Sequence, residues 1–385
     1  MSHLFPALRT MLEELIAAPS VSSLVPEMDQ GNLGVIERLA GWLEAAGFWT
    51  RVMPLPGHPD KANLVATLGG GPGGLVLSGH TDTVPCDPER WEHDPHQLTE
   101  EGGRLYGLGT ADMKSFLALA IEAARGLEAG DLKQPLIVLA TADEESSMKG
   151  ARALAAAGRP LGRYAVIGEP TSLRPVRMHK GVMWESIRLI GRTGHASDPG
   201  LGLNALDGMQ EVMSEIIAWR AELRDRFRHP SFPLPHPTVN LGHIHGGDNP
   251  NRICGECELQ IDLRVLPGLD MEELRGELAR RVAAVAERRG LKWELKPLFA
   301  GIPPAETPAE SLIVRAGEAL TGHPAEAASY GTEAPFFNEM GMETLVLGPG
   351  NIEQAHQPNE YLEVSRIDPT LDLLRALIRR FCLEG

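Results

Sequence analysis

The sequence predicts an α/β protein in which a mostly parallel central sheet lies between helices and a smaller α+β domain is inserted. Two observations lead to this fold class. Short apolar runs that end in polar clusters recur along the chain, whereas a middle segment alternates apolar and polar residues. The apolar runs are Leu75–Leu77, Leu136–Ala140, Ala165–Ile167 and Thr344–Leu347. Continuous runs of this length are typical of strands buried on both faces, as in a parallel sheet covered by helices.

Helices are expected between these strands. The segments Met113–Leu127, Lys149–Ala157 and Ser311–Leu320 have helical character. The first 20 residues do not match a signal peptide, because Glu13 and Glu14 stand where it would need an apolar core. They predict an amphipathic helix instead. The glycine-rich segment 69–74 lacks the order G-x-G-x-x-G and a following helix, so it predicts a hairpin turn rather than a nucleotide-binding loop.

The middle of the chain has a different pattern. Val182–Ile190 and Asn251–Val265 alternate apolar and polar residues, which indicates strands with one face in solvent. Leu206–Leu223 and Met271–Arg288 have the spacing of amphipathic helices. The order strand, helix, strands, helix, strand therefore predicts a small inserted domain. The predicted domains are 1–178 together with 297–385, and the insertion 179–296.

Composition excludes several classes of function. The chain has 385 residues, which is more than a single core usually supports. It carries 36 Lys and Arg against 52 Asp and Glu, and this net charge of −16 argues against nucleic acid or an anionic membrane as a partner. No stretch approaches the roughly 20 apolar residues that a membrane-spanning helix needs. Four cysteines are too few for a disulfide-stapled secreted fold, so we expect a cytoplasmic protein.

Polar residues follow the predicted strands at their ends, where ligands bind in open α/β sheets. His80 and Asp82 follow the first apolar run, Glu144 and Glu145 the second, and Glu169 the third. Adjacent acids directly after a buried strand repel each other and lose solvation unless a cation is near or the loop is exposed to water. Both arrangements are compatible with the residues alone.

Two more residues extend this set. Asp112 precedes a predicted helix, either as its N-cap or as a functional carboxylate. His356 follows the fourth apolar run, either as an ordinary loop histidine or as a ligand. Because three such groups hold one zinc ion and two ions can share a carboxylate, the whole set predicts a metal centre at one sheet edge. Cys254 and Cys257 have no second pair and lie in an alternating strand, which favours a structural role over a redox or metal role.

Several strings of the sequence match a known superfamily. They are GHTDTVP (79–85), YGLGTADMK (106–114), TADEE (141–145), IGEPTSL (167–173) and NRIC (251–254). Together they closely resemble the zinc-dependent aminoacylase and carboxypeptidase superfamily, peptidase family M20. GTEAPFF (331–337) and LGPGNIEQAHQPNEY (347–361) favour a deacetylase member over a desuccinylase. The resemblance implies a zinc-exopeptidase-like catalytic domain with an inserted ferredoxin-like lid and dimerisation domain.

The resemblance also implies a ligand set for two Zn²⁺ ions, which Co²⁺ can replace. His80 and Glu169 would bind one ion, Glu145 and His356 would bind the other, and Asp112 would bridge them. No residue of this set is missing from the chain.

The same resemblance implies the remaining roles. Glu144 would be the general base and acid, and Asp82 would orient His80. His195, from the inserted domain, would reach the active site of the partner subunit. The candidates for contact with the substrate carboxylate are Asn251, Arg252, Thr332 and Lys180.

The activity that the resemblance implies is hydrolysis of N2-acetyl-L-ornithine to L-ornithine and acetate, a step of arginine biosynthesis, by a homodimer. Glu333 is a candidate for the wall of a pocket that takes the cationic side chain, with a surface role as the alternative. Two other functions stay open. One is a related N-acyl-amino-acid amidohydrolase that acts on succinyl-diaminopimelate, acetylcitrulline or a peptide. The other is a non-catalytic metal-binding scaffold, which is disfavoured because neither the ligands nor Glu144 are lost.

Overall fold

The computed structural model describes residues 6–384, which form two compact units. The first unit contains residues up to 177 together with 307–326 and 332 onward. The second contains 178–306 and 327–331. The sequence places the inserted segment at 179–296, so the second unit of the structure takes in more of the chain after residue 296. No helix between residues 6 and 384 has the length and apolar character needed to cross a membrane.

The first unit is built on a central sheet whose inner strands are parallel. The strands follow the order β1-β2-β6-β3-β7-β15 and then β8. Their bounds are Trp49–Leu55, His58–Leu68, Leu136–Thr141, Leu75–His80, Tyr164–Ile167, Glu343–Val346 and Val176–His179. The pairs among β6, β3, β7 and β15 are parallel, whereas β1, β2 and β8 pair with their neighbours in antiparallel fashion. The predicted fold class, with a mostly parallel central sheet, is confirmed.

The predicted hairpin at the glycine-rich segment is wrong. Residues 69–74 join β2 to β3, but these two strands are not neighbours, because β6 lies between them in the sheet. The segment is therefore a connection that passes over the end of β6. The local glycine signal indicates a turn but carries no information about a strand that enters the sheet from later in the chain.

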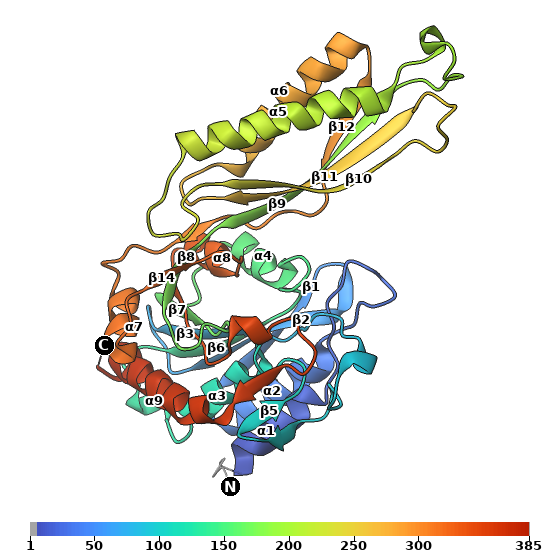
Figure 1. Ribbon diagram of the computed structural model, residues 1–385. Helices are drawn as coiled ribbons and strands as arrows, with labels where there is room; N and C mark the ends of the chain where they lie inside the picture. The colour runs from blue at the N-terminus through green and yellow to red at the C-terminus, as the bar shows by residue number, and fades with distance from the viewer. Residues whose placement is uncertain (1–5, 385) are drawn as a thin grey trace. The chain divides into compact units, whose positions relative to one another are not determined.

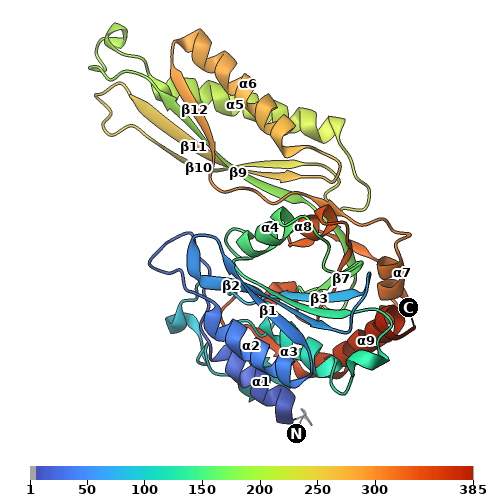
Figure 2. The same ribbon diagram turned by 180° about the vertical axis from the view of Figure 1, so that it is seen from behind.

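Helices cover both faces of this sheet (Figures 1 and 2). One face carries α1 (Pro6–Ile16), α2 (Leu33–Ala45), α3 (Lys114–Ala123), α7 (Leu312–Thr321) and α9 (Ile367–Ile378). The other carries α4 (Lys149–Ala156) and α8 (Ala334–Glu339). A small antiparallel sheet joins β4 (Thr99–Glu101), β5 (Arg104–Tyr106) and β16 (Tyr361–Glu363). Short helical turns occupy Pro88–Arg90, Ala129–Asp131, Pro199–Leu201, Ile352–Gln354, Val364–Arg366 and Arg379–Glu384.

Close packing between α3 and the sheet sets the position of the strand ends. Every residue of α3 is buried. A Cβ at Gly168, just after β7, would lie 1.9 Å from Cγ of Phe116 on this helix, so only glycine fits there. The loop that carries Glu169 is thereby pressed against the start of α3. The three predicted helices of this unit are found as α3, α4 and α7.

The second unit is an antiparallel sheet with two helices on one face (Figures 1 and 2). Its strand order is β10-β11-β9-β12, and the chain order is strand, helix, two strands, helix, strand. This is the ferredoxin-like arrangement. The bounds are β9 Gly181–Ile190, α5 Ala205–Arg226, β10 Thr238–Gly246, β11 Glu256–Val265, α6 Met271–Arg289 and β12 Lys292–Pro297. The short strands β13 (Ala305–Glu306) and β14 (Glu326–Ala328) pair with β8 and so belong to the central sheet rather than to this one.

Local sequence explains both long helices of this unit. Asn204 caps α5 by accepting the backbone N–H of Leu206, and Asp270 caps α6 by accepting those of Glu272 and Glu273. Gly290 ends α6 with a φ of 68° in the left-handed region. The apolar faces of both helices and the inward side of β11 form the core of the second unit. Alternation along β11 therefore corresponds to one buried face and one partly exposed face.

Candidate metal centre

The ends of three parallel strands bring acids and histidines together in the first unit. His80 is the last residue of β3, Glu144 follows the end of β6, and Glu169 follows the end of β7. Parallel strands end at the same edge of a sheet, so these side chains meet there. Asp112 stands just before α3, and His356 lies in the loop between β15 and β16.

Distances join all five predicted metal ligands into one cluster. His80 Nε2 lies 3.1 Å from Asp112 Oδ1, and His356 Nε2 lies 2.9 Å from Glu145 Oε2 and 3.6 Å from Asp112 Oδ2. Two sets of three residues have ligand atoms within 4.8 Å of one another. The sets are His80, Glu144 and Glu169, and His80, Asp112 and Glu145. Asp112 thus lies between the two histidines.

Burial decides between the alternatives that the sequence leaves open. Glu144 is 8% exposed and Glu169 is 5% exposed, so neither is a solvated surface acid. Asp112 does not cap α3, because the N-cap position is Met113 and no side-chain cap hydrogen bond is formed. His356, by contrast, is about half exposed, at 53% for its side chain.

Asp82 connects His80 to the loop that carries Glu144 and Glu145. His80 Nδ1 donates a hydrogen bond of 2.9 Å to the main-chain carbonyl of Asp82, while the Asp82 carboxylate lies 3.8 Å from the same nitrogen. That carboxylate accepts the backbone N–H groups of Glu144 at 3.2 Å and Glu145 at 3.1 Å. With Nδ1 committed as a donor, the ring of His80 presents Nε2 to the cluster.

The electrostatics of the cluster favour a cation. Burial and the charge of Glu169 raise the pKa of Glu144 well above its usual range. Burial and the charge of Asp112 do the same for the pKa of Glu169 and, to a lesser extent, of Glu145. The hydrogen bond to Glu145 raises the pKa of His356 to about 9. Without positive charge these carboxylates oppose one another in a site that water hardly reaches.

The residues fit divalent metal ions on an observation independent of charge. Glu169 Oε1 is buried and has no hydrogen-bond partner among residues 6–384. A buried carboxylate oxygen without a partner is costly unless something absent from the protein chain satisfies it. Imidazole nitrogen and carboxylate oxygen are the donor set that suits zinc and similar divalent ions. The cluster is therefore a candidate metal centre.

Backbone conformation marks the same loops. Within residues 6–384, the non-glycine residues with positive φ are Asp143, Met148, Ser172, Leu173, His356 and Asn359. All of them lie in the three loops that follow β6, β7 and β15. Left-handed conformations in non-glycine residues cost free energy and tend to gather at functional sites. These loops are thus held in shapes that their own residues do not prefer.

Sequence reasoning missed two supports of the cluster. Lys61, 2% exposed, lies 2.6 Å from Asp143 Oδ1 and 2.7 Å from Asp29, and so pairs with the residue that precedes Glu144. Glu360, 1% exposed, accepts backbone N–H groups of the loop that carries Asp112. For Lys61 the sequence offered two signals. One is a lysine at the start of an apolar strand, and the other is a third acid, Asp143, directly before Glu144 and Glu145. Glu360 offered none.

Two predicted residues of the first unit are more deeply buried than a role in a pocket wall suggests. Glu333 is 0% exposed, so the surface alternative is excluded, and it accepts a 3.0 Å hydrogen bond from Thr141 Oγ1. Burial raises the pKa of Glu333 to about 7. Thr332 is also 0% exposed, and its Oγ1 accepts the backbone N–H of Ala334 at 3.1 Å.

The remaining predicted residues belong to the second unit. His195 is exposed, and its Nδ1 lies 2.7 Å from Ser197 Oγ. Arg252 is exposed and pairs with Asp248 at 2.6 Å, and a backbone bridge joins His195 to Arg252. Asn251 is exposed beside them. Lys180 is buried, and its Nζ donates to the carbonyls of Leu234 and His236 at 2.8 and 2.7 Å.

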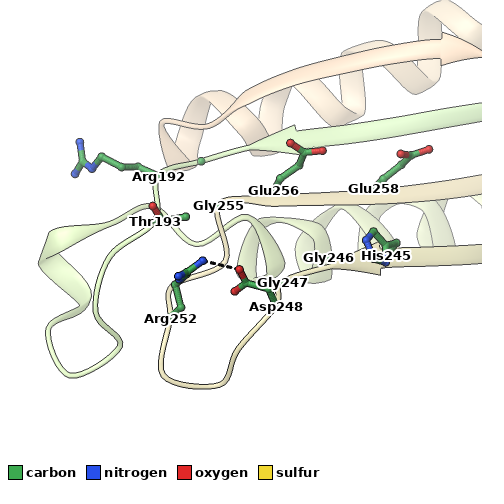
Figure 3. A pocket seen from close by; sticks show the side chains of 11 residues that line it. Arg192, Thr193, His245, Gly246, Gly247, Asp248, Arg252, Gly255, Glu256 and Glu258 are labelled. Carbon is green, nitrogen blue, oxygen red and sulfur yellow. Dashed lines mark hydrogen bonds and ion pairs between the residues drawn. The ribbon is translucent and has the colours of Figure 1, made fainter.

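A cavity of about 610 Å³ lies beside Arg252 within the second unit. Figure 3 shows Arg252 turned toward Asp248, with Arg192, His245, Glu256 and Glu258 on the surrounding strands and loops. None of the acids and histidines of the first unit lines this cavity. Cys254 and Cys257 are buried and unbridged, and burial raises the pKa of Cys257 to about 11, so this thiol stays protonated and belongs to the core.

The buried carboxylates and histidines gathered at the ends of the parallel strands suit a metal-dependent amide hydrolase. The chain belongs to peptidase family M20/M25/M40, whose family model matches residues 76–380. It is 48% identical to acetylornithine deacetylase of Pasteurella multocida (strain Pm70), with 98% of each chain covered. It is 47% identical to acetylornithine deacetylase of Erwinia tasmaniensis, with 96% of each covered.

Solved structures share the fold at much lower identity. A tripeptidase from Staphylococcus aureus has a TM-score of 0.76 at 21% identity, covering 97% of both chains. A dinuclear metal-binding peptidase of family M20 from Bacillus subtilis has a TM-score of 0.65 at 16% identity, covering 96% of this chain and 97% of that one. The fold therefore extends over both units of the chain.

Proposed function

We propose that this protein hydrolyses N2-acetyl-L-ornithine to L-ornithine and acetate. The observation that carries the proposal is near half identity to acetylornithine deacetylases over almost the whole length of both chains. The buried acid–histidine cluster supports the reaction type, since an amide is unreactive toward neutral water without an activating centre.

The centre would hold two Zn²⁺ ions, with Co²⁺ as a substitute. His80 and Glu169 would bind one ion, Glu145 and His356 the other, and Asp112 would bridge them. The placement of Asp112 between His80 and His356, at 3.1 and 3.6 Å, supports the bridging role. The ions would supply a nucleophile at neutral pH, because divalent metals lower the pKa of water from 15.7 to about 7.

Glu144 is the proposed general base and acid. It lies within 4.8 Å of the ligand atoms of His80 and Glu169, and its backbone is fixed by Asp82. Glu144 would take a proton from the attacking water and deliver it to the nitrogen of the leaving ornithine. Its raised pKa suits a group that must both accept and donate a proton near neutral pH.

Substrate recognition is assigned to Arg252, Asn251, Thr332 and Lys180. Arg252 suits the α-carboxylate of the substrate because a guanidinium binds a carboxylate through two parallel hydrogen bonds. Arg252 is exposed, and among residues 6–384 it bonds to Asp248 through Nη1, which leaves other guanidinium donors for such a contact. Lys180 already donates to two backbone carbonyls, so its part would be weaker.

The second unit would also form a homodimer that shares its sites. His195 of one subunit would stabilise the oxyanion at the centre of the other. Mixing inactive His195→Ala with inactive Glu144→Ala tests this arrangement, since each hybrid dimer would contain one intact site. Random exchange should restore about a quarter of the wild-type activity in a two-fold dimer. No recovery, with subunit exchange confirmed by mass, would exclude the shared site.

The proposed setting is arginine biosynthesis in the cytoplasm. All four cysteines are unbridged, although Cys254 and Cys257 are close in sequence, which agrees with a reducing compartment. A product with a free amino group and a cationic side chain is consistent with a biosynthetic precursor of arginine.

A substrate comparison tests the activity. The full chain, loaded with Zn²⁺ or Co²⁺, is assayed for release of free amine from N2-acetyl-L-ornithine, acetylcitrulline, acetylmethionine and succinyl-diaminopimelate. We expect the highest kcat/KM on acetylornithine, and no turnover after chelation. A clear preference for acetylmethionine or succinyl-diaminopimelate would contradict the assignment and favour a related amidohydrolase. Metal binding without hydrolysis of any of them would favour a scaffold.

A further inference from the structure

We propose that Glu360 is a positioning residue, which holds the loop carrying Asp112 and ties it to the segment carrying His356. The inference rests on the metal-dependent function proposed above. It assigns to Glu360 no contact with substrate or metal. Its role is to fix where the bridging carboxylate stands.

The carboxylate of Glu360 accepts hydrogen bonds from three backbone N–H groups of one loop. Its Oε1 accepts those of Ala111 at 2.7 Å, Asp112 at 3.0 Å and Gly109 at 3.1 Å, and Oε2 also accepts Gly109 at 3.1 Å. Glu360 is 1% exposed, so these contacts are shielded from bulk solvent. Each bond pairs a backbone donor that would otherwise be buried without a partner.

The loop is shaped to present these donors. Gly109 has a φ of +86°, a left-handed conformation that favours glycine, and a Cβ there would lie 3.1 Å from the buried side chain of Lys114. N–H groups of one loop that converge on an acceptor in this way form a concave anion site. In many proteins such a site takes a phosphate or other free anion. Here the occupant is Glu360 of the same chain.

The main chain of Glu360 links the second loop to the first. Its carbonyl accepts the N–H of Gly107 at 3.1 Å, and the next residue, Tyr361, pairs with Tyr106 in the antiparallel β16–β5 ladder. His356 precedes Glu360 by one short turn of chain. The two loops that supply Asp112 and His356 are therefore joined through one residue.

The contacts of Asp112 explain why its position matters. Asp112 must present one oxygen toward His80 and the other toward His356, and its own N–H is held by Glu360. A side chain without an acceptor would leave three buried donors unpaired, whereas glutamine keeps an oxygen for the donors at Oε1 but places an NH₂ group where Oε2 faces the N–H of Gly109. Displacement of about 1 Å in a catalytic constellation can cost as much as 10²-fold in rate.

Metal binding by the full chain tests the proposal. The variants are Glu360→Gln and a matched control, Glu122→Gln, whose carboxylate is 2% exposed and accepts three hydrogen bonds from Arg125 at the far end of α3. Each protein is titrated with Co²⁺ alone by equilibrium dialysis, and the visible absorption of the bound cobalt is recorded. Thermal unfolding of the metal-free proteins is measured alongside.

We expect Glu360→Gln to bind the weaker of two Co²⁺ ions about 10–100-fold less tightly, with an altered absorption spectrum. Its kcat should fall while KM for acetylornithine changes little. Glu122→Gln should keep the affinity and spectrum of the wild type whatever its stability. Two ions bound by Glu360→Gln with wild-type affinity and spectrum would overturn the proposal, as would equal losses in both variants.

Further outcomes keep the inference separate from the proposed function. If Glu360→Gln does not fold, Glu360→Asp serves instead, since it withdraws the carboxylate by one methylene, and wild-type cobalt affinity in that variant would overturn the proposal. A wild-type chain that binds two Co²⁺ ions but does not hydrolyse acetylornithine would remove the proposed function and leave the role of Glu360 standing. A wild-type chain that binds fewer than two ions would overturn the role of Glu360.

Discussion

The two units of the molecule hold their functional candidates in opposite ways. In the first unit, His80, Glu144 and Glu169 are buried at strand ends, and neighbouring backbone groups fix their loops. In the second unit, His195 and Arg252 are exposed and held by contacts at the surface. A buried set of carboxylates is built for an ion that must stay in place. An exposed arginine and histidine suit a ligand or partner that comes and goes.

The difference has energetic consequences. Burying several like charges is unfavourable, so each acid of the first unit needs a compensating partner or an ion. The exposed groups of the second unit, His195 and Arg252, keep most of their hydration and need none. Changes at buried positions of the first unit should therefore alter the reaction rate, metal binding or stability. Changes at exposed positions of the second unit should affect activity alone.

The largest effect is expected at Glu144. Glu144→Gln keeps the size of the side chain but removes proton transfer, so kcat should fall by roughly 10²–10⁴-fold. The ligand atoms of His80, Asp112, Glu145, Glu169 and His356 are unchanged, so two metal ions should remain bound. Turnover by stopped assay and metal content by elemental analysis check both parts. Glu310→Gln, at an exposed acid, is the control, and it should match the wild type. Full activity in Glu144→Gln would refute the assigned role.

A stability effect of nearly the same size is expected at Lys61. Lys61→Met leaves Asp143 buried without its closest cation, and breaking a buried pair costs about 3–5 kcal/mol. The free energy of unfolding, from urea denaturation, measures this. Lys149→Met is the matched control, because Lys149 approaches the same carboxylate at 3.6 Å but is 42% exposed. That exposed pair should contribute about 0–1 kcal/mol. Equal losses in both variants would mean that burial of Lys61 contributes little.

Much of this architecture follows from short-range sequence patterns. Apolar runs such as Leu136–Ala140 predict the buried parallel strands, and polar residues at their ends predict the edge where the cluster lies. The bridging position of Asp112 and the ligand pairing come from the resemblance to a family, since spacing alone leaves a helix cap equally open.

What sequence patterns do not predict depends on contacts between distant segments. Glu360 meets Gly109 across most of the chain, and Lys61 meets Asp143 across 82 residues of sequence. The hairpin predicted at residues 69–74 fails for the same reason, because β6 inserts between β2 and β3. Hydrogen bonds from a side chain to backbone N–H groups far away in the sequence leave no local pattern, which is why Glu360 could not be singled out.

The interior of the second unit contains an exception that sharpens the comparison. His179 is 0% exposed, and its Nε2 has no hydrogen-bond partner among residues 6–384. Burial lowers the pKa of His179 to about 4 from an ordinary value of 6.5. His179 therefore binds a proton less readily in the folded state than in the unfolded state. Stability from this group is complete above pH 6.5 and is lost as the pH falls toward 4, by about 3 kcal/mol in all.

His179→Gln should remove that part of the pH dependence. We expect the free energy of unfolding to fall by about 3 kcal/mol less between pH 7 and pH 4 in the variant than in the wild type. Other titrating groups cancel in this difference. His243→Gln, at an exposed histidine of β10, should follow the wild-type curve. Parallel curves for His179→Gln and the wild type would show that His179 is protonated in the folded state as easily as in the unfolded one.

The smallest effect is expected at Arg252, where the two units should differ most clearly. Arg252→Ala removes an exposed guanidinium whose partner, Asp248, is itself exposed, so the stability should not change measurably. If Arg252 binds the substrate carboxylate, kcat/KM on acetylornithine should fall by roughly 10–100-fold, the equivalent of one charge-assisted hydrogen-bonding contact. Metal content should be that of the wild type, because none of the ligands is touched.

Arg192→Ala provides the control for that last variant. Arg192 is an exposed arginine that lines the same cavity, so it matches Arg252 in charge and surroundings but has no proposed contact with substrate (Figure 3). A loss confined to Arg252→Ala would separate recognition by one side chain from the general positive charge of this surface. An equal loss in both variants would assign the effect to electrostatic attraction of the anionic substrate, and it should then weaken as salt is added. Unchanged kcat/KM in Arg252→Ala would remove Arg252 from the substrate site and leave the second unit without its strongest candidate for recognition.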